Sequence, residues 1–329
     1  MSTKQTVKRS TTKSTSKKST ETAKPLFERV GFLGLGIMGS AMSGNLMKAG
    51  FEVHGFDPTP KARQQFKAAG GHVSSDPAEL VRSVQAVICS LPSGAALIET
   101  AGILARVGRK GLLVIETSTL DIKDKETARD IMAKKGIVLL DCPLSGTGAQ
   151  AARKDLTVYA SGPKADIRRL APVFEGFSKA HFDLGVFGNG MKMKLMANLL
   201  VAIHNVSTAE ALLLGQRWGI SPSTAVKVLS DGAGGSRMLQ VRGPMMEDEG
   251  WTDATMKVSV WQKDMKLIAQ ALVDTHVPAP LFSASIPVYN AAMGMGHADN
   301  DTAAVFDVLQ RMSSPEKKSP VKKQVSRKK

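Results

Sequence analysis

A glycine-rich stretch at residues 30–39, VGFLGLGIMG, constrains the fold of this chain more than any other feature. It joins a β-rich apolar run to a segment that favours a helix, and a second apolar run ends about twenty residues further on at Asp57. Strand, glycine turn, helix, strand and acid in this order predict a site for a dinucleotide. Gly34 allows the tight turn, Gly36 lets the backbone approach a pyrophosphate, and Gly39 lets the helix pack against the sheet.

The same motif predicts which dinucleotide is bound. Leu35, Ile37 and Met38 complete the turn and place a pyrophosphate at the helix N-terminus, where free N–H groups favour an anion. The Asp57 carboxylate can accept hydrogen bonds from both ribose hydroxyls and repels a 2′-phosphate, so NAD is the expected cofactor. NADP is the alternative, because two basic residues follow closely, Lys61 and Arg63.

The order of β-rich runs and helical stretches predicts the fold class. Between residues 29 and 183 they alternate, and the β-rich runs are continuously apolar, as in parallel strands covered on both faces. The expected strands are residues 30–33, 52–56, 86–90, 112–116, 137–141, 156–160 and 180–183. Residues 191–216 are expected to form one helix of about 39 Å, apolar around most of its circumference.

The chain is therefore expected to be α/β, with an N-terminal Rossmann domain containing a doubly wound parallel sheet, followed by an all-α domain. A long interdomain helix would join the two. The expected boundaries are a basic tail at residues 1–27, the Rossmann domain at 28–187, the helical domain at 188–312 and a second basic tail at 313–329. Further helices are expected at residues 222–231, 255–275, 286–293 and 301–312.

The net charge of +15 suggests at first a nucleic-acid partner. However, residues 1–24 and 313–329 each carry seven Lys or Arg and one Glu, which leaves the rest of the chain at only +3. These tails have too few aliphatic side chains to form a core, so we expect them to be disordered. We expect no nucleic-acid partner, with attraction of the tails to polyanions as the alternative.

The apolar runs and the cysteines bear on location. The longest apolar run, residues 195–203, is interrupted by Asn198 and is too short to span a bilayer, so no membrane partner is expected. Cys89 and Cys142 lie in or just after apolar runs and are expected to be free thiols in a reducing compartment. The cytoplasm is the expected location. The mitochondrion is the alternative, because residues 1–20 contain no acidic residue.

The long helix offers a candidate catalytic pair, because Lys194 and Asn198 lie four residues apart and share one face. Hydride transfer from a hydroxyl needs a proton acceptor, and burial or nearby cations lower the pKa of a lysine towards neutrality. Asn198 would then bond the same hydroxyl or hold the lysine. On spacing alone, Lys194 is equally consistent with a surface charge. Lys192 points elsewhere, and His204 lies off this face and is expected to be structural.

Small residues near the long helix suggest where ligands lie. Ser145, Gly146 and Thr147 follow a strand run and offer free N–H groups that suit a carboxylate, with a plain turn as the alternative. Gly188 and Gly190 precede the helix and are expected to let the backbone approach the cofactor. The sequence has no GxSxG motif, no P-loop lysine and no Cys or His cluster with metal-ligand spacing. A redox reaction without a metal is therefore expected.

Taken together, these residues resemble the β-hydroxyacid dehydrogenase family, which includes 3-hydroxyisobutyrate dehydrogenase, tartronate semialdehyde reductase and L-threonate dehydrogenase. The resemblance covers about residues 29–312, leaving only the tails outside. Four motifs carry it in order: GLGIMG at residues 34–39, DCPLSG at 141–146, GNG at 188–190 with Lys194 and Asn198, and KDMKL at 263–267.

This resemblance implies an NAD(P)-dependent oxidoreductase that transfers a hydride between nicotinamide and a 3-hydroxy acid, or the corresponding semialdehyde or keto acid. It implies that Lys194 is the general acid/base and that Asn198 orients the reacting group. Ser145 and Gly146 would hold the substrate carboxylate beside Thr147. The cofactor would be lined by Leu91, Pro92, Thr119 and Lys263. A homodimer or homotetramer built by the helical domain is also implied.

One departure from the family bears on the substrate. The family often has two glycines after the serine and a glycine three residues later, where this chain has Gly146-Thr147 and Gln150. PLSGT looks closer to the L-threonate and sugar-acid branch, which favours a polyhydroxylated acid. Two other functions stay open. One is a catalytically silent dinucleotide-binding scaffold whose basic tails bind nucleic acid, and the other is a 6-phosphogluconate-type decarboxylating dehydrogenase, which needs a phosphate-binding cluster.

Overall fold

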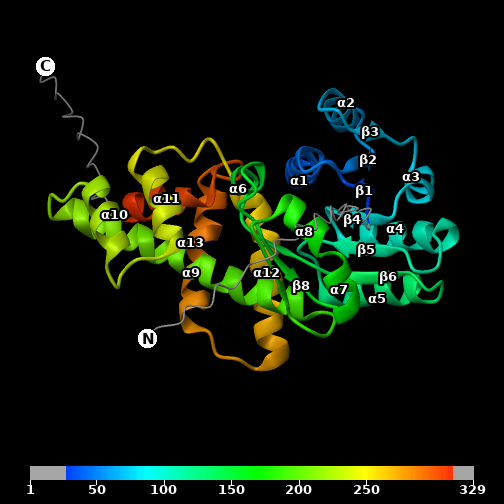
Figure 1. Cartoon of the computed structure of the whole chain (residues 1–329). Coiled ribbons are helices and arrows are strands. Elements are labelled where there is room, and N and C mark those ends of the chain that lie inside the picture. The colour runs from blue at the N-terminus through cyan, green and yellow to red at the C-terminus, as the bar shows by residue number, and fades with distance from the viewer. Residues whose placement is uncertain (1–26, 314–329) are drawn as a thin grey trace, which may run out of the picture.

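The computed structural model describes residues 27–313, which form an α/β domain and a helical domain side by side (Figure 1). Within this range every strand ends before residue 184, and all elements from residue 189 onward are helical. The expected fold class is therefore confirmed. The basic tails fall almost entirely outside the described residues, so their disorder, their relation to nucleic acid and the location of the protein in the cell stay predictions.

The first domain is built on a six-stranded parallel sheet with strand order β3-β2-β1-β4-β5-β6. Its strands are β1 (Arg29–Leu33), β2 (Glu52–Phe56), β3 (His72–Val73), β4 (Ala86–Cys89), β5 (Leu113–Glu116) and β6 (Val138–Asp141). The connecting helices are α1 (Ile37–Lys48), α2 (Pro60–Ala68), α3 (Pro77–Ser83), α4 (Gly94–Val107) and α5 (Ile122–Ala133). The order reverses between β1 and β4, and a ligand of such a sheet binds at this switch point.

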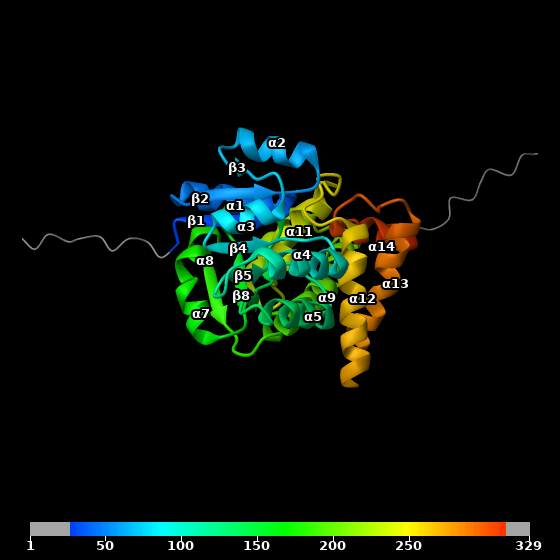
Figure 2. The ribbon, with the colours of Figure 1, turned by 90° about the vertical axis from the view of Figure 1, so that its right-hand side faces the viewer.

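Both faces of this sheet are buried. Val30 and Phe32 of β1 pack into one core with residues of α1 and α8 (Ala171–Phe177), whereas Leu33 packs into the opposite core with residues of α3, α4 and α5. Figure 2 shows α3, α4 and α5 grouped together on one side of the sheet. Successive side chains of a strand point to opposite faces, so strands covered on both sides read as continuous apolar runs.

The last two expected strands do not join this sheet. β8 (Thr157–Ala160) pairs with β9 (Ala180–Asp183) in parallel and with β7 (Leu144–Ser145) antiparallel, forming a second sheet. One bridge between Asp141 and Ser161 links it to β6. The pattern does not predict β3 or β7, because two residues are too few for a periodicity. The helices of this part are α6 (Gly148–Ala152), α7 (Lys164–Arg169) and α8.

α9 (Asn189–Arg217) is the central helix of the second domain and also contacts β8 of the first. It packs against α11, α12, α13 and α14, and it buries the polar side chains of Lys194, Asn198 and Asn205. By length and composition alone, α9 is long and apolar enough to cross a membrane. However, other helices pack against α9 on several sides, as they do around the core helix of a helical domain.

The other helices surround α9. They are α10 (Pro222–Asp231), α11 (Arg237–Glu247), α12 (Val258–Thr275), α13 (Pro280–Gly294), the short η1 (Thr302–Ala304) and α14 (Val305–Met312). α10 has the expected bounds, and Ser221 caps it by accepting from the backbone N–H of Thr224. The pattern does not predict α11, because Pro244 lies inside it and a proline usually ends a helix.

Candidate active site

The glycine turn after β1 has the geometry that a dinucleotide requires. Gly34 has φ +95°, and a Cβ there would lie 2.1 Å from the carbonyl oxygen of Ser90. A Cβ on Gly39 would lie 2.0 Å from the carbonyl oxygen of Gly34, so α1 sits directly against the turn. A Cβ on Gly36 would meet nothing within 4 Å. The turn is closed where the chain packs and open where a pyrophosphate is predicted, so these residues fit the cofactor.

Asp57 lies beside this turn at the end of β2. One carboxylate oxygen accepts from the backbone N–H of Leu35 at 2.8 Å and the other from that of Thr59 at 2.8 Å. The carboxylate is therefore held in place by backbone donors. Arg63 lies next to it, donating to the carbonyl oxygens of Asp57 and Pro58. A charge of each sign thus lies at the predicted ribose position.

A cavity of about 290 Å³ extends from the carboxyl edge of the sheet to α12. Its wall includes Ile37 and Met38 from the glycine turn, and Leu91 and Thr119 from the loops after β4 and β5. Lys263, Asp264 and Val260 of α12 form the opposite side. Pro92 is not part of this wall. Gly34, Leu35, Gly36, Gly39 and Asp57 also lie outside the wall, on the glycine turn and the end of β2.

A second cavity of about 110 Å³ adjoins the first. Ser145, Gly146, Thr147 and Gln150 form its side in the α/β domain. Residues of α9, α11 and α12, together with Met256 and Thr302, form the rest. The two cavities share Gly146, Thr147, Lys194 and Met256. The α/β domain and the helical domain therefore each contribute one side of a bipartite site, and Lys194 lies at the junction.

Lys194 is buried, with 8% of its surface exposed, and no acceptor among residues 27–313 lies within hydrogen-bond distance of its Nζ. Burial is the main cause that lowers the pKa of its ammonium, the neighbouring Lys263 lowers it further, and Asp264 opposes the change. A lysine in this state can exchange a proton with a ligand. By contrast, Lys192 is exposed and His204 is half-buried, and neither lines the two cavities.

Asn198 reaches α12 rather than the lysine. Its Nδ2 donates to Oδ2 of Asp264 at 2.9 Å, while the other carboxylate oxygen of Asp264 is buried without a hydrogen-bond partner among the described residues. Burial raises the pKa of the Asp264 carboxyl, and the nearby Lys194 and Lys263 ammonium groups oppose this. Lys194, Asn198 and Asp264 therefore form one buried group, of which the sequence pattern indicated only the first two as site residues.

Lys263 connects the two domains beside the larger cavity. Its Nζ donates to the carbonyl oxygen of Thr119 at 2.7 Å and lies 3.8 Å from Asp264. Two residues expected to line the cofactor, one from each domain, are thus in direct contact.

The carboxylate-binding prediction for Ser145, Gly146 and Thr147 needs one correction. The N–H of Thr147 is not free, because it donates to Oε1 of Gln150 at 3.0 Å. Gly146 has φ +129°, and a Cβ there would lie 2.6 Å from the side chain of Leu156. The turn is therefore held in place, and only Ser145 and Gly146 remain as donors from this segment.

The start of α9 is anchored by a buried ionic cluster. Lys125 Nζ lies 2.6 Å from Glu116 and 2.7 Å from Asp141, and all three side chains are fully buried. The other oxygen of Asp141 accepts from the N–H of Met191 at 2.8 Å. A Cβ on Gly190 would lie 2.4 Å from the carbonyl oxygen of Tyr159. Gly190 is needed for this packing. Neither Gly188 nor Gly190 belongs to the walls of the two cavities, and their contact with the cofactor stays a prediction.

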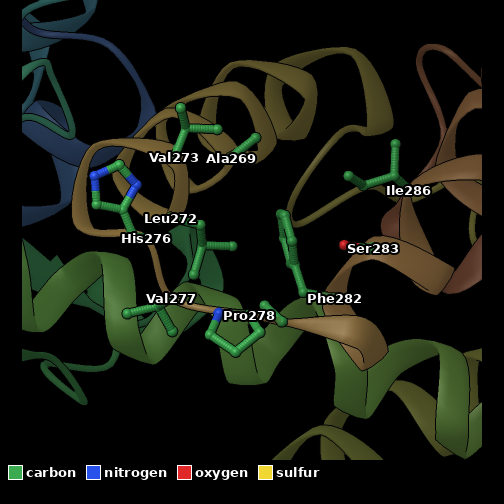
Figure 3. A pocket seen from close by; sticks show the side chains of 10 residues that line it. Ala269, Leu272, Val273, His276, Val277, Pro278, Phe282, Ser283 and Ile286 are labelled. Atoms are coloured by element: carbon green, nitrogen blue, oxygen red, sulfur yellow. The ribbon is translucent and has the colours of Figure 1, made fainter.

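A larger hollow of about 540 Å³ lies at the turn between α12 and α13 (Figure 3). Its wall is apolar, with Leu272, Val273, Val277 and Phe282, and His276 is its one titratable residue. It contains none of the expected site residues. It lacks convergent polar groups, so we do not assign a reaction to it.

Both parts of the chain match known protein families. Residues 29–187 match the NAD binding domain of 6-phosphogluconate dehydrogenase, and residues 188–309 match the NAD-binding domain of NADP-dependent 3-hydroxyisobutyrate dehydrogenase.

Whole-length relatives give the same result. L-threonate dehydrogenase of Cupriavidus necator is 30% identical over 88% of this chain and 98% of its own length. The mitochondrial 3-hydroxyisobutyrate dehydrogenase of Mus musculus is 31% identical over 85% of this chain and 87% of its own. A solved structure of Mycobacterium tuberculosis 3-hydroxyisobutyrate dehydrogenase with L-serine has a TM-score of 0.79 at 29% identity, covering 87% of this chain and all of that one.

Proposed function

Because this chain belongs to the β-hydroxyacid dehydrogenase family and is an NAD(P)-dependent dehydrogenase, we propose that it interconverts a 3-hydroxy acid and the corresponding semialdehyde or keto acid, with Lys194 as general acid/base. One observation carries the proposal: Lys194 is buried without a protein acceptor where the two cavities meet. A group that exchanges a proton with the substrate must reach substrate and cofactor together.

The residues of the chain account for the proton and for substrate orientation. Nicotinamide, when bound, would supply the hydride-transfer chemistry in either direction. In oxidation the neutral amine of Lys194 takes the hydroxyl proton as the C–H bond breaks and the C=O bond forms. In reduction the ammonium returns a proton to the forming hydroxyl. Burial lowers the pKa of Lys194, so its neutral amine forms at a lower pH than that of an exposed lysine.

The remaining polar groups hold the substrate. Ser145 and the N–H of Gly146 bind its carboxylate, while Thr147, fixed by Gln150, shapes this end of the cavity. Asn198 bonds Asp264 and keeps the Lys194 face of α9 against α12. The reacting carbon then lies between the carboxylate site and Lys194.

The test is an absorbance assay with NAD or NADP across L-threonate, glycerate, 3-hydroxyisobutyrate, tartronate semialdehyde and 6-phosphogluconate. We expect turnover of at least one unphosphorylated acid, and a loss of about 10²–10⁴-fold in kcat for Lys194→Ala with cofactor binding retained. Lys192→Ala, an exposed neighbour on the same helix, is the matched control. Near wild-type kcat in Lys194→Ala would refute the lysine assignment. Inactivity on every acid would favour the catalytically silent scaffold. Activity only on 6-phosphogluconate would favour the decarboxylating dehydrogenase.

For the cofactor we propose NAD in preference to NADP. Asp57 is held at the predicted ribose position by two backbone donors, and its charge opposes a 2′-phosphate. Arg63 donates to the backbone carbonyl of Asp57, so it would stabilise any NADP that binds. Titration followed by cofactor fluorescence gives the dissociation constants of NADH and NADPH. The difference between these constants should become smaller in Asp57→Asn and larger in Arg63→Met. Unchanged preference in Asp57→Asn would contradict the assignment.

We also propose that the helical domain forms a homo-oligomer. Four of the strongly exposed large apolar residues in the described range lie in the α/β domain, whereas thirteen lie in the helical domain. The α12–α13 hairpin projects from the body of the molecule (Figures 1 and 2), and Val273, Val277 and Leu281 are exposed at its end. Light scattering of the purified chain should give the molar mass of a dimer or tetramer. The double variant Val277→Asp/Leu281→Asp should lower this molar mass. A monomer at micromolar concentration would exclude this.

A further inference from the structure

The substrate cavity is longer than the carboxylate site and Lys194 require. α9 contributes Lys194, Ala197, Asn198 and Val201 to its wall, a span of about 10 Å along the helix axis. The walls beyond Asn198 are largely apolar, with Val201, Met238 and Trp261. Two polar residues interrupt this apolar surface, Arg242 of α11 and Thr302 of η1. A substrate atom beyond the reacting carbon would therefore meet a guanidinium.

Arg242 is buried, with only 2% of its surface exposed, and its donors are used unequally. Nε lies 2.9 Å from Asp301 and 3.2 Å from the hydroxyl oxygen of Thr302, and Nη1 donates to the hydroxyl of Thr255 at 3.1 Å. Nη2 makes no hydrogen bond to residues 27–313, and Arg242 lines the cavity. A buried guanidinium with unused donors on a cavity wall calls for an acceptor from the ligand.

The charge around Arg242 indicates which acceptor fits. Asp301 is fully buried, contacts the guanidinium directly, and also accepts from the N–H groups of Thr255 and Met256. Arg242 and Asp301 are therefore already a compensated pair. A second carboxylate or a phosphate would bring an uncompensated charge into this buried region, which is costly, whereas a hydroxyl oxygen accepts from Nη2 without adding charge.

We propose that Arg242 is a specificity-determining residue whose Nη2 donates to a substrate hydroxyl beyond the reacting carbon, so that the enzyme prefers polyhydroxylated acids over aliphatic ones. The inference rests on the proposed function, because the proposed positions of carboxylate and reacting carbon define the far end of the cavity. Arg237, the other arginine of the wall, is exposed and interacts with Asp155 and Gln240, so it does not make this selection.

The test compares two acids that differ by one hydroxyl, L-threonate and 4-deoxy-L-threonate. For the wild type we expect kcat/KM to favour L-threonate by about 10- to 100-fold, the usual effect of a hydrogen bond to a charged group. Arg242→Lys keeps the positive charge near Asp301 but removes the forked donor, so the ratio should approach one through a loss on L-threonate alone. Arg311→Lys, which alters a surface arginine paired with Asp307, is the matched control and should leave the ratio unchanged.

A purely structural role of Arg242 would give a different result. In that case Arg242→Lys would lower kcat/KM for both acids by the same factor, and the proposal would be overturned. It would also be overturned if the wild type did not distinguish the two acids. Calorimetric dissociation constants for both acids, measured with cofactor bound to Lys194→Ala, test the same ratio without turnover. The wild type could be inactive on every acid while the dissociation constants still favour L-threonate. That result would refute the proposed reaction and support the role of Arg242.

Discussion

Among residues 27–313 two lysines are buried, one in each domain, and their surroundings are opposite. Lys125 of α5 lies between Glu116 and Asp141 in the α/β domain, and burial of its ammonium is outweighed by these two carboxylates, so its pKa is raised. Lys194 of α9 has no hydrogen-bond partner among the described residues and lies on a cavity wall, and burial lowers its pKa.

The difference separates a structural charge from the one that we propose to be catalytic. The ammonium of Lys125 is satisfied within the fold and holds β5, β6 and the start of α9 together through Asp141. The ammonium of Lys194 is left without a partner by the fold and becomes available to a ligand. Burial alone does not indicate function, but burial without a partner beside a cavity does.

The largest expected effect is on folding, for Lys125→Met. Removing the lysine leaves Glu116 and Asp141 as two buried carboxylates without their cation, which should destabilise the protein by about 3–5 kcal/mol. Urea unfolding followed by circular dichroism measures this change. Lys123→Met, an exposed lysine on the same helix, is the control and should cost little. A loss for Lys125→Met no greater than that of the control would mean that the cluster does not hold the fold.

A smaller effect is expected on the pH dependence of the reaction. In the proposed mechanism oxidation requires neutral Lys194, so kcat/KM for oxidation should rise as pH increases through the lowered pKa, and kcat/KM for reduction should fall over the same range. Asp264 raises this pKa and Lys263 lowers it. Asp264→Asn should therefore move the profile to lower pH and Lys263→Met to higher pH. Profiles that move in the same direction in both variants would show that another group controls the pH dependence.

The smallest effect is on stability, for Lys194→Met. Because the folded state lowers the pKa of Lys194, this lysine opposes folding below the lowered pKa, and the penalty disappears as pH rises to its usual value of 10.5. Thermal unfolding should show Lys194→Met at least as stable as the wild type at neutral pH, with the difference shrinking at alkaline pH. The effect of Lys125 on stability has the opposite sign, because its pKa is raised in the folded state. Its stabilising contribution is present below pH 10.5 and is lost as the pH rises above the raised pKa. Marked destabilisation by Lys194→Met would contradict this comparison.

Much of the fold follows from local patterns. The glycine turn, the apolar runs of β1, β2, β4, β5 and β6, and the length of α9 are all readable from the sequence, because each depends on residues near one another in the chain. The small second sheet and α11 are not readable in this way. The pairing of β8 with β7 and β9 depends on distant segments, and the packing of the helical domain accommodates Pro244 inside α11.

The candidate site, like the fold, was predictable only where it depends on residues close together in the chain. Helical spacing brought Lys194 and Asn198 to one face, and a sequence motif pointed to Lys263. The partner of Asn198 is Asp264, 66 positions away, and Arg242 of α11 lines the same cavity as Asn198. The KDMKL motif contains Asp264 but does not show that Asp264 accepts from Asn198, and no local signal distinguishes Arg242 from other charged residues on a helix. These contacts arise only when α9, α11 and α12 pack together.

The sequence by itself determined the class of cofactor, the division into a sheet domain and a helical domain, and a short list of candidate catalytic side chains. These properties depend on turn geometry and periodicity, which are local. The tertiary structure alone decided which buried lysine is paired and which is free, that the N–H of Thr147 is used by Gln150, and that Gly190 serves packing. Burial and charge compensation are set by residues that are distant in the chain, and together they determine what each group can do chemically.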